Sequence, residues 1–428
     1  MCVIRVHAFA CRRFADFKAS VADAVTIPAC SLLLCTSDDR LCATVARSMW
    51  RTADRGCKRD PVNQPVRTAK TVSVCYPSVS SSPRPKRGIK GRPMSLPPAS
   101  FPPPFQIIRA SHVVIGVNDL ARSRTFYVDG IGLVISDETK DAIYLRGVEE
   151  AAHHSLVLKH TSAVPAAQRV GLRVFTEDDL DRAKAHFDKA GLSTDFVEVP
   201  HQGRTLHASD PLGTPLELYA TMETMPRLTV AFDKWTGASP QRIDHFQILV
   251  PDVPRACAFY AGMGFRLSEY VCPDDSDELL FAFLQRKGNP HDIVLANGTG
   301  PRLHHFAFTV AESARLFQAC DILGSLGFGK QLEHGPGRHG PGHALFVYFR
   351  DPDGHRIELF NSHYQMMDIE NQPVRWSASY TRQRGWGLPP QRKWHFEASR
   401  FVGVIPRDPA RMPDPCTLEK FLAEQAAS

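Results

Sequence analysis

The residues best suited to chemistry lie in one stretch near the C-terminal end, GRHGPGHALFVYFRDPDGHRIELF, which spans residues 337–360. In this stretch Glu358 stands between Ile357 and Leu359, inside an apolar run. A carboxylate buried in such surroundings is costly unless a cationic group meets it. His339 precedes the run in a glycine-rich loop. The stretch therefore combines a carboxylate that needs a cation with an imidazole that can exchange a proton near neutral pH.

The pattern of the same stretch predicts a strand, a turn and a second strand. Residues 344–350 are rich in aromatic side chains and Val, which is typical of a buried strand. Residues 351–354 read Asp-Pro-Asp-Gly, with Pro and Gly where a type I turn favours them. Residues 355–360 then form the predicted returning strand, and Glu358 lies on it.

Two further segments offer histidines that could join Glu358. RIDHF contains His245, and RLHHF contains His304 and His305. Iron(II) sites that activate oxygen commonly use two histidines and one carboxylate on one face, with other positions open. Along RLHHFAFTV, His304 alternates with apolar side chains, whereas His305 shares its face with small ones that leave room for a ligand. This alternation favours His305 and predicts that His304 packs outside the site.

Residues 337–360 resemble the motif of the type I extradiol ring-cleaving dioxygenases, the catechol 2,3-dioxygenase family of the vicinal oxygen chelate superfamily. The motif is Gly-x-His, a Tyr nine residues later, Asp-Pro-x-Gly, and a Glu ten residues after the Tyr. The matching positions are His339, Tyr348, Asp351, Pro352, Gly354 and Glu358. The resemblance covers about residues 105–400. It implies an enzyme that opens a catechol or substituted catechol ring beside the diol with O2, giving a muconic-semialdehyde-type product.

The resemblance also implies a site and a cofactor. The implied metal is iron(II), with manganese(II) as the alternative. Its implied ligands are His245, His305 and Glu358, and the implied catalytic residues are His291, His339 and Tyr348. In the family, the residue at the place of His291 lies beside the oxygen site and steadies negative charge, His339 handles protons, and Tyr348 hydrogen-bonds the substrate oxygen.

The tail after residue 365 is similar to that of the homoprotocatechuate branch of the family, where it covers the mouth of the site. This resemblance implies substrate contacts from Gln247, His334 and Arg384. The branch has Asn where this chain has Gln247, and Arg where it has His334. Since a carboxylated substrate is held best by arginine, we expect an uncharged or hydroxyl-bearing catechol to be preferred.

The chain contains an internal duplication of roughly 130 residues. RIDHFQILVPDVPRACAFYAGMGF repeats the earlier SHVVIGVNDLARSRTFYVDGIGL, and RDPDGHRIELF repeats SDPLGTPLELY. The repeat pairs His112 with His245 and Glu217 with Glu358. The earlier half has VGLRVF where the later half has its histidine pair. We therefore expect a metal-free first copy in which His112 is structural.

The family resemblance implies an α+β fold with two tandem vicinal oxygen chelate domains. Each domain would contain two βαβββ modules that form a cupped barrel. The expected divisions are a metal-free domain over 105–225, a catalytic domain over 240–365 and a C-terminal lid over 366–428. Related enzymes are commonly homotetramers, which makes a tetramer our expectation here.

Residues 1–104 differ from the remainder in composition. Residues 1–93 carry 17 Lys and Arg, six Asp and no Glu, together with seven of the eleven cysteines. We expect this prefix to be disordered or non-native, with Met94 as the functional start; a targeting presequence or a small extra domain are the alternatives. Residues 94–428 have a net charge of −5, which argues against a nucleic-acid surface.

The remaining composition bears on location and on rival functions. Four scattered cysteines without metal-type spacing suit the reducing cytoplasm, and no apolar run reaches the length of a membrane span. A glyoxalase-like isomerase or hydrolase is the nearest rival enzyme, and His291, His339 and Tyr348 argue against it. A metal-free ligand-binding module is the other rival, and the His245, His305 and Glu358 set argues against that.

Overall fold

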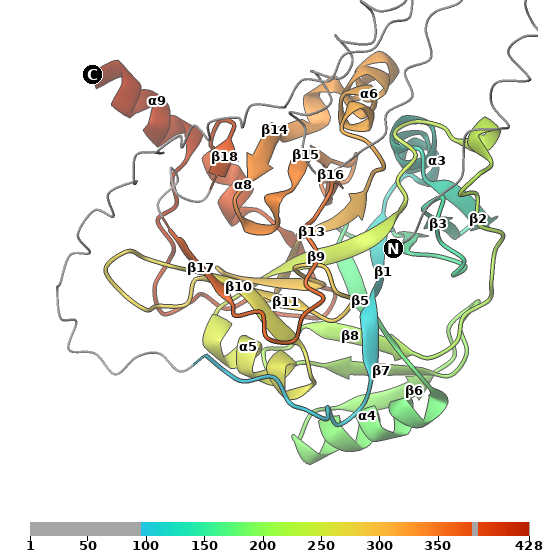
Figure 1. The fold of residues 1–428 in the computed structure, drawn as a ribbon. Coiled ribbons are helices and arrows are strands. Elements are labelled where there is room, and N and C mark those ends of the chain that lie inside the picture. Colours follow the sequence, from blue (N-terminus) through green and yellow to red (C-terminus); the bar gives the residue numbers. More distant parts are fainter. Residues whose placement is uncertain (1–95, 379–383, 428) are drawn as a thin grey trace, which may run out of the picture. The chain divides into compact units, whose positions relative to one another are not determined.

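The computed structural model describes residues 96–378 and 384–427, and in this range the chain runs as shown in Figure 1. Residues 96–106 precede the first strand and contain neither helix nor strand. The predictions made for residues 1–95 fall outside the described residues.

The first half contains two successive strand–helix–three-strand units that share one eight-stranded sheet. Its elements are β1 (Ile107–Val117), α3 (Leu120–Arg124), the π-helical turn η1 (Thr125–Ile131), β2 (Val134–Glu138), β3 (Ala142–Arg146), β4 (Leu156–His160), β5 (Ala167–Val174), α4 (Glu177–Lys189), β6 (Thr194–Val197), β7 (Thr205–Ser209) and β8 (Pro215–Tyr219). The strand order is β2-β3-β4-β1-β5-β8-β7-β6. The central pair β1 and β5 is antiparallel.

The second half repeats this arrangement. Its elements are β9 (Arg242–Val250), α5 (Val253–Gly262), β10 (Arg266–Cys272), β11 (Phe281–Gln285), β12 (Ile293–Asn297), β13 (Arg302–Thr309), α6 (Ala314–Leu323), β14 (Leu332–His339), β15 (Leu345–Arg350) and β16 (Arg356–Asn361). The order β10-β11-β12-β9-β13-β16-β15-β14 matches the first sheet strand for strand. The predicted α+β fold of two duplicated halves is confirmed.

The first helix of each half begins at an aspartate whose side chain caps it. Asp119 accepts a hydrogen bond from the backbone nitrogen of Arg122, and Asp252 accepts one from that of Arg255. Such a cap satisfies a backbone donor that would otherwise lack a partner at the helix start. The caps therefore fix where the chain leaves the central strands β1 and β9.

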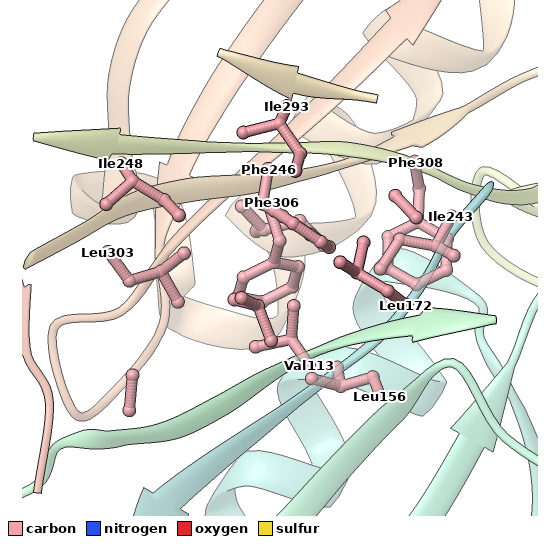
Figure 2. Close-up of a cluster of buried hydrophobic side chains, with 14 of the residues drawn as sticks. Val113, Leu156, Leu172, Ile243, Phe246, Ile248, Ile293, Leu303, Phe306 and Phe308 are labelled. Carbon is pink, nitrogen blue, oxygen red and sulfur yellow. The ribbon is translucent and has the colours of Figure 1, made fainter. Parts of the chain in front are cut away.

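One face of each sheet packs against the other sheet in a shared apolar core. Figure 2 shows Val113 and Leu172 from the first half near Phe246 and Phe306 from the second, and all four side chains are fully buried. Burying a side chain of this size contributes about 1.5–3 kcal/mol. The opposite faces border cavities. We call the face that carries Tyr144, His154 and Glu217 the first cup, and the face that carries His245, His305 and Glu358 the second cup.

Two reciprocal hydrogen bonds tie the halves together. The hydroxyl of Tyr127, in the first half, donates to Asp351 Oδ2 of the second at 2.9 Å. The hydroxyl of Tyr260, in the second half, donates to Asp210 Oδ2 of the first at 3.2 Å. Burial is the larger cause and the nearby carboxylate the smaller one, and together they raise the pKa of each tyrosine well above its ordinary value. Each Asp-Pro-x-Gly turn is thus anchored by the opposite half.

The tail after β16 adds strands to the second sheet. Its elements are β17 (Val374–Ser377), β18 (Arg384–Trp386), α8 (Arg392–Phe396), β19 (Ser399–Arg400) and α9 (Leu418–Ala427). β17 pairs with β10, β18 with β14 and β19 with β13, so the tail borders the second cup at three places (Figure 1). Among the described residues, no helix has both the length and the apolar character needed to cross a membrane.

Candidate metal centre and active site

The three expected metal ligands lie on three adjacent strands. His245 is on β9, His305 on β13 and Glu358 on β16. Ala307 is the register partner of both His245 and Glu358, which sets those two side chains on one face of the sheet. All three ligands are almost fully buried, with 2–3% of each residue exposed.

The donor atoms of these ligands converge. His245 Nε2 and His305 Nε2 each lie 3.2 Å from Glu358 Oε2, and the two nitrogens are 3.4 Å apart. Such spacing lets one ion of ordinary ligand distance, about 2.0–2.2 Å, sit between all three atoms. The residues present therefore fit a divalent transition metal with two imidazoles and one carboxylate.

Groups behind the ligands orient them. His245 Nδ1 lies 3.0 Å from Asp244 Oδ2, and His305 Nδ1 lies 2.8 Å from His304 Nδ1. His304 Nε2 in turn donates to the backbone oxygen of Trp394 at 2.9 Å. These contacts engage the Nδ1 atoms of both ligands and leave both Nε2 atoms for a metal, which is the usual way that outer groups tune such histidines.

The pKa values of the three ligands do not all shift the same way. Burial would lower the pKa of His245, but contacts with Asp244 and Glu358 raise it above its ordinary value. Burial alone would raise the pKa of Glu358, but contacts with His245, His305 and His339 hold it well below its ordinary value. Burial lowers the pKa of His305 to about 4. Glu358 and His305 are thus in the deprotonated forms that bind a metal at neutral pH.

His304 differs from its predicted position. It was expected on the apolar face of β13, but the register of β13 against β9 shifts between Leu303 and His305. This irregularity turns the His304 ring toward Trp394, with ring centroids 4.5 Å apart. His304 therefore supports His305 from behind instead of packing in the shared core, because a bulge breaks the simple alternation of side chains.

The expected catalytic residues lie around the place where the three ligand atoms converge. His339 Nε2 lies 3.0 Å from the Tyr348 hydroxyl and 3.7 Å from Glu358 Oε1. The rings of His291 and His245 are 4.3 Å apart between centroids. Burial lowers the pKa of His291 well below its ordinary value, and within the described residues its Nδ1 atom is buried with no hydrogen-bond partner.

A cavity of about 110 Å³ opens in front of these groups, and we call it the active-site cavity. The ligands and the three expected catalytic residues all line it. Its apolar wall includes Val271, Phe281, Phe283 and Val294, from β10, β11 and β12. A planar aromatic ring placed between this wall and the ligands would lie beside the metal position.

The expected substrate residues are placed in three different ways. Gln247 lines the cavity. His334 does not: its ring lies parallel to that of Tyr348, 5.8 Å away, and meets the ring of Trp394. The side chain of Arg384 lies outside the described residues, although its backbone in β18 pairs with His339. His334 is the register partner of Tyr348 on the neighbouring strand and does not line the cavity, so direct substrate contact by His334 is not supported.

Sequence reasoning missed Asp244, His363, Trp394 and His395. The last three line the cavity, and His363 Nδ1 lies 3.4 Å from Asp244 Oδ2. Asp244 had a local signal, since it directly precedes a ligand histidine. His363 had none, because it follows the end of β16 and is turned inward where Ser362 has a φ of 54°.

Among the described residues, two further groups of side chains come close enough to share a metal. One is His245, His291 and His363, in the active-site cavity. The other is His153, His201 and Glu223, in the first half. The rings of His153 and His201 are stacked 3.8 Å apart at 7°, so their in-plane lone pairs cannot both point at one ion. The stacking therefore argues against a metal at the first-half group, whereas the other group shares His245 with the expected ligand set.

Comparison with known proteins agrees with this geometry. The family model described as the Glyoxalase/Bleomycin resistance protein/Dioxygenase superfamily matches residues 109–218 and again 242–359. These two ranges correspond to the two halves of the fold.

Named relatives share most of the described chain. A manganese-dependent 2,3-dihydroxybiphenyl 1,2-dioxygenase from Geobacillus genomosp. 3 is 27% identical over 63% of this chain and 90% of its own length. Metapyrocatechase from Pseudomonas sp. (strain CF600) is 27% identical over 64% of this chain and 91% of its own length. A homoprotocatechuate 2,3-dioxygenase structure from Arthrobacter globiformis superposes with a TM-score of 0.68 at 36% identity, covering 74% of this chain and 98% of that one.

Proposed function

We propose that this chain is an iron(II) enzyme that cleaves a substituted catechol with O2. The proposal starts from its family: the chain belongs to the Glyoxalase/Bleomycin resistance protein/Dioxygenase superfamily and is an extradiol dioxygenase within it. The proposed product is a muconic-semialdehyde-type compound. One observation carries the proposal: two histidine nitrogens and one carboxylate oxygen converge within 3.4 Å of one another at the base of a cavity.

The metal would be held by His245, His305 and Glu358, with manganese(II) as the alternative to iron. When bound, it would supply Lewis-acid polarisation of the diol and a path for electrons between the ring and oxygen. The protein supports this chemistry by keeping the three ligands buried and by lowering the pKa of Glu358 and His305. A relative is named as manganese-dependent, which is why both metals belong in the first test.

His339 and Tyr348 are the proposed proton-handling pair. Their 3.0 Å contact puts an imidazole and a phenol at the edge of the cavity nearest Glu358 Oε1. His339 can take the proton from a catechol hydroxyl there, since an imidazole exchanges protons near neutral pH. Tyr348 can then hydrogen-bond the substrate oxygen. The stacking of His339 on Phe346, with centroids 3.8 Å apart, holds its ring in place.

His291 is proposed to stabilise negative charge that develops on the oxygen side of the site. It is only 5% exposed and lies between the rings of His245 and His363. A preorganised donor in a buried, low-dielectric site stabilises developing charge far more than it would in water. Its position against the ligand ring supports this role.

The proposed specificity is for an uncharged or hydroxyl-bearing catechol, contacted by Gln247 and Arg384. We also propose a homotetramer in the cytoplasm. Among the described residues, Cys257, Cys272, Cys320 and Cys416 form no disulfide, which accords with a reducing compartment. Light scattering on the purified protein would give the oligomer directly.

The function is tested by loading the full chain with iron(II) or manganese(II) and supplying a panel of catechols in air. We expect oxygen consumption and a yellow product with at least one catechol, and loss of both after chelation. A loaded protein that consumes no oxygen with any catechol would reject the proposal. Turnover of a glutathione thiohemiacetal in its place would favour a glyoxalase-type activity.

A further inference from the structure

A second cavity adjoins the active-site cavity. It also measures about 110 Å³, and all its lining residues lie in the part of the chain that the structure describes. Five lining residues are common to both cavities: Gln247, Val271, Phe281, Trp394 and His395. Two cavities that share this much wall are consecutive compartments of one hollow.

The strands show how one compartment leads to the next. On β9 the residues on the face of the second cup run His245, Gln247, Leu249; the first two line the active-site cavity and the last two line the second cavity. On β12, Val294 lines the first and Ala296 the second. Residues two apart on a strand share a face, so the second cavity continues along the second cup by one step of each strand.

The tail also contributes to the wall of the second cavity. Pro413, Asp414, Pro415 and Cys416 line the second cavity opposite the sheet. Asn297 anchors this segment by donating to the backbone oxygen of Arg411 at 3.2 Å, and Asp414 forms an ion pair with Lys420. The wall is therefore mainly apolar, which disfavours a charged occupant because a charge loses its hydration there.

We propose that the second cavity is the subsite for an uncharged ring substituent of about three or four carbons, so that the substrate is an alkyl- or alkenyl-catechol. The inference rests on the proposed ring-cleaving function and names its substrate class. The diol would face the metal ligands, and the substituent would pass Gln247 and Phe281 to reach Ala296 and Cys416.

The size of the cavity sets the length of the substituent. A closed apolar cavity of roughly 150 Å³ holds benzene, so one of about 110 Å³ takes a slightly smaller group. Each methylene that leaves water for such a cavity strengthens binding by about fourfold. A propyl group is therefore expected to tighten binding by at least about tenfold after the loss of its own rotational freedom.

The test measures binding in the absence of oxygen, so that it does not depend on turnover. Calorimetry on the metal-loaded full chain compares catechol with 3-propylcatechol, 4-propylcatechol and 3-(3,4-dihydroxyphenyl)propionate. We expect one propyl isomer to bind at least about tenfold tighter than catechol, and the acid of equal length to gain less than that isomer. Equal dissociation constants for catechol and both propyl isomers would overturn the inference.

Variants then locate the subsite. Cys416→Trp from the tail and Ala296→Leu from β12 each fill the second cavity, and each is expected to abolish the propyl advantage. Leu422→Trp is the matched control, because Leu422 is 52% exposed on α9 and lines neither cavity. A propyl advantage that survives in both filling variants would overturn the inference.

These outcomes separate the inference from the proposed function. Oxygen consumption with catechol but no propyl advantage would leave the ring-cleaving function standing and reject the subsite. A propyl advantage without oxygen consumption would support the subsite and reject the ring-cleaving function. Failure of every catechol to bind would reject both.

Discussion

In the first cup, Glu217 is satisfied by donors from its own half, whereas in the second cup Glu358 faces two histidines at a single oxygen. His112 Nε2 and Gln202 Nε2 lie 2.8 and 2.7 Å from Glu217 Oε1, and His207 Nε2 lies 2.8 Å from Oε2. The corresponding contacts of Glu358 Oε2 are both 3.2 Å. The first arrangement resembles a completed hydrogen-bond network, and the second resembles a ligand set.

Strand register identifies the substitutions behind this difference. Gly171 is the register partner of both His112 and Glu217, as Ala307 is for the ligands of the second cup. Two residues before Gly171 stands Arg169, which therefore takes the place of His305. A permanent cation at a ligand position opposes a metal ion.

The position opposite the carboxylate also differs. His207 pairs with Glu217 in the register of β7 and β8, where Tyr348 pairs with Glu358 in β15 and β16. The first cup thus has His207, which donates to its glutamate, where the second cup has the phenol of Tyr348 beside the active-site cavity. One duplicated scaffold can satisfy a buried carboxylate with protein donors or leave it for a metal, and a few side chains decide which.

Removing a ligand should have the largest effect. We expect His245→Ala, His305→Ala and Glu358→Gln each to reduce bound metal to below about a tenth of the wild-type content, because two remaining ligands bind a divalent ion weakly. Glu217→Gln in the first cup is the control and should keep one metal per chain. Plasma emission analysis of purified protein measures this; two metals per wild-type chain would break the comparison.

Removing the proton-handling imidazole should have the next largest effect. His339→Ala is expected to lower kcat by about 10²–10⁴ while the metal content stays unchanged. His207→Ala, which alters the equivalent end of the first cup, should leave kcat near wild type. Steady-state oxygen uptake at saturating catechol provides the measurement, and equal losses in the two variants would contradict the assignment of the second cup.

The support behind His305 should matter less. His304→Ala removes the Nδ1 contact at 2.8 Å and is expected to weaken metal binding by about 10–100-fold without abolishing it. Competition with a chelator of known affinity would measure the change. Retention of iron in His305→Ala together with its loss in His304→Ala would show that the two histidines have been assigned the wrong way round.

The change in the free energy of unfolding between neutral and acid pH should also distinguish the two cups. In the first cup, burial would raise the pKa of Glu217, but contacts with His112 and His207 outweigh it and hold the pKa well below its ordinary value. Burial lowers the pKa of His154. Both folded-state values lie below those of the unfolded chain, so the unfolded chain binds more protons and the fold loses stability as the pH falls.

Glu217→Gln is therefore expected to cost about 1–3 kcal/mol at pH 7 and less at pH 4. Urea unfolding at both pH values measures the difference. A destabilisation that grows as the pH is lowered would contradict the protonation states inferred for the first cup.

Substrate preference is the smallest expected effect. We expect an uncharged substituted catechol to exceed 3,4-dihydroxyphenylacetate in kcat/KM by about tenfold, since one charge-assisted contact of the homoprotocatechuate branch is missing. From the sequence, His334→Arg would have moved preference toward the acid. Because His334 packs against Tyr348 and Trp394 and does not line the active-site cavity, we expect this variant to lower turnover of both substrates with little change in their ratio.

Much of the candidate site followed from local sequence. The spacing from His339 through Tyr348 to Glu358 spans one strand, one turn and one strand, so covalent connection and strand periodicity largely determine how these residues face each other. The duplication likewise predicted two equivalent halves, because a repeated pattern of strands and helices repeats its packing.

Local pattern failed where several distant segments meet. Alternation placed His304 outside the site, and a bulge in β13 turned it toward Trp394, which is 90 residues away in the chain. His363 has no local sequence signal, because only the folded chain places it beside Asp244. The sequence by itself determined the residue types of the proposed ligand set, their spacing and the duplicated sheet. Only the tertiary structure decided what supports His305 and how the tail extends the cavity, because both depend on contacts between segments that nothing in the local sequence relates.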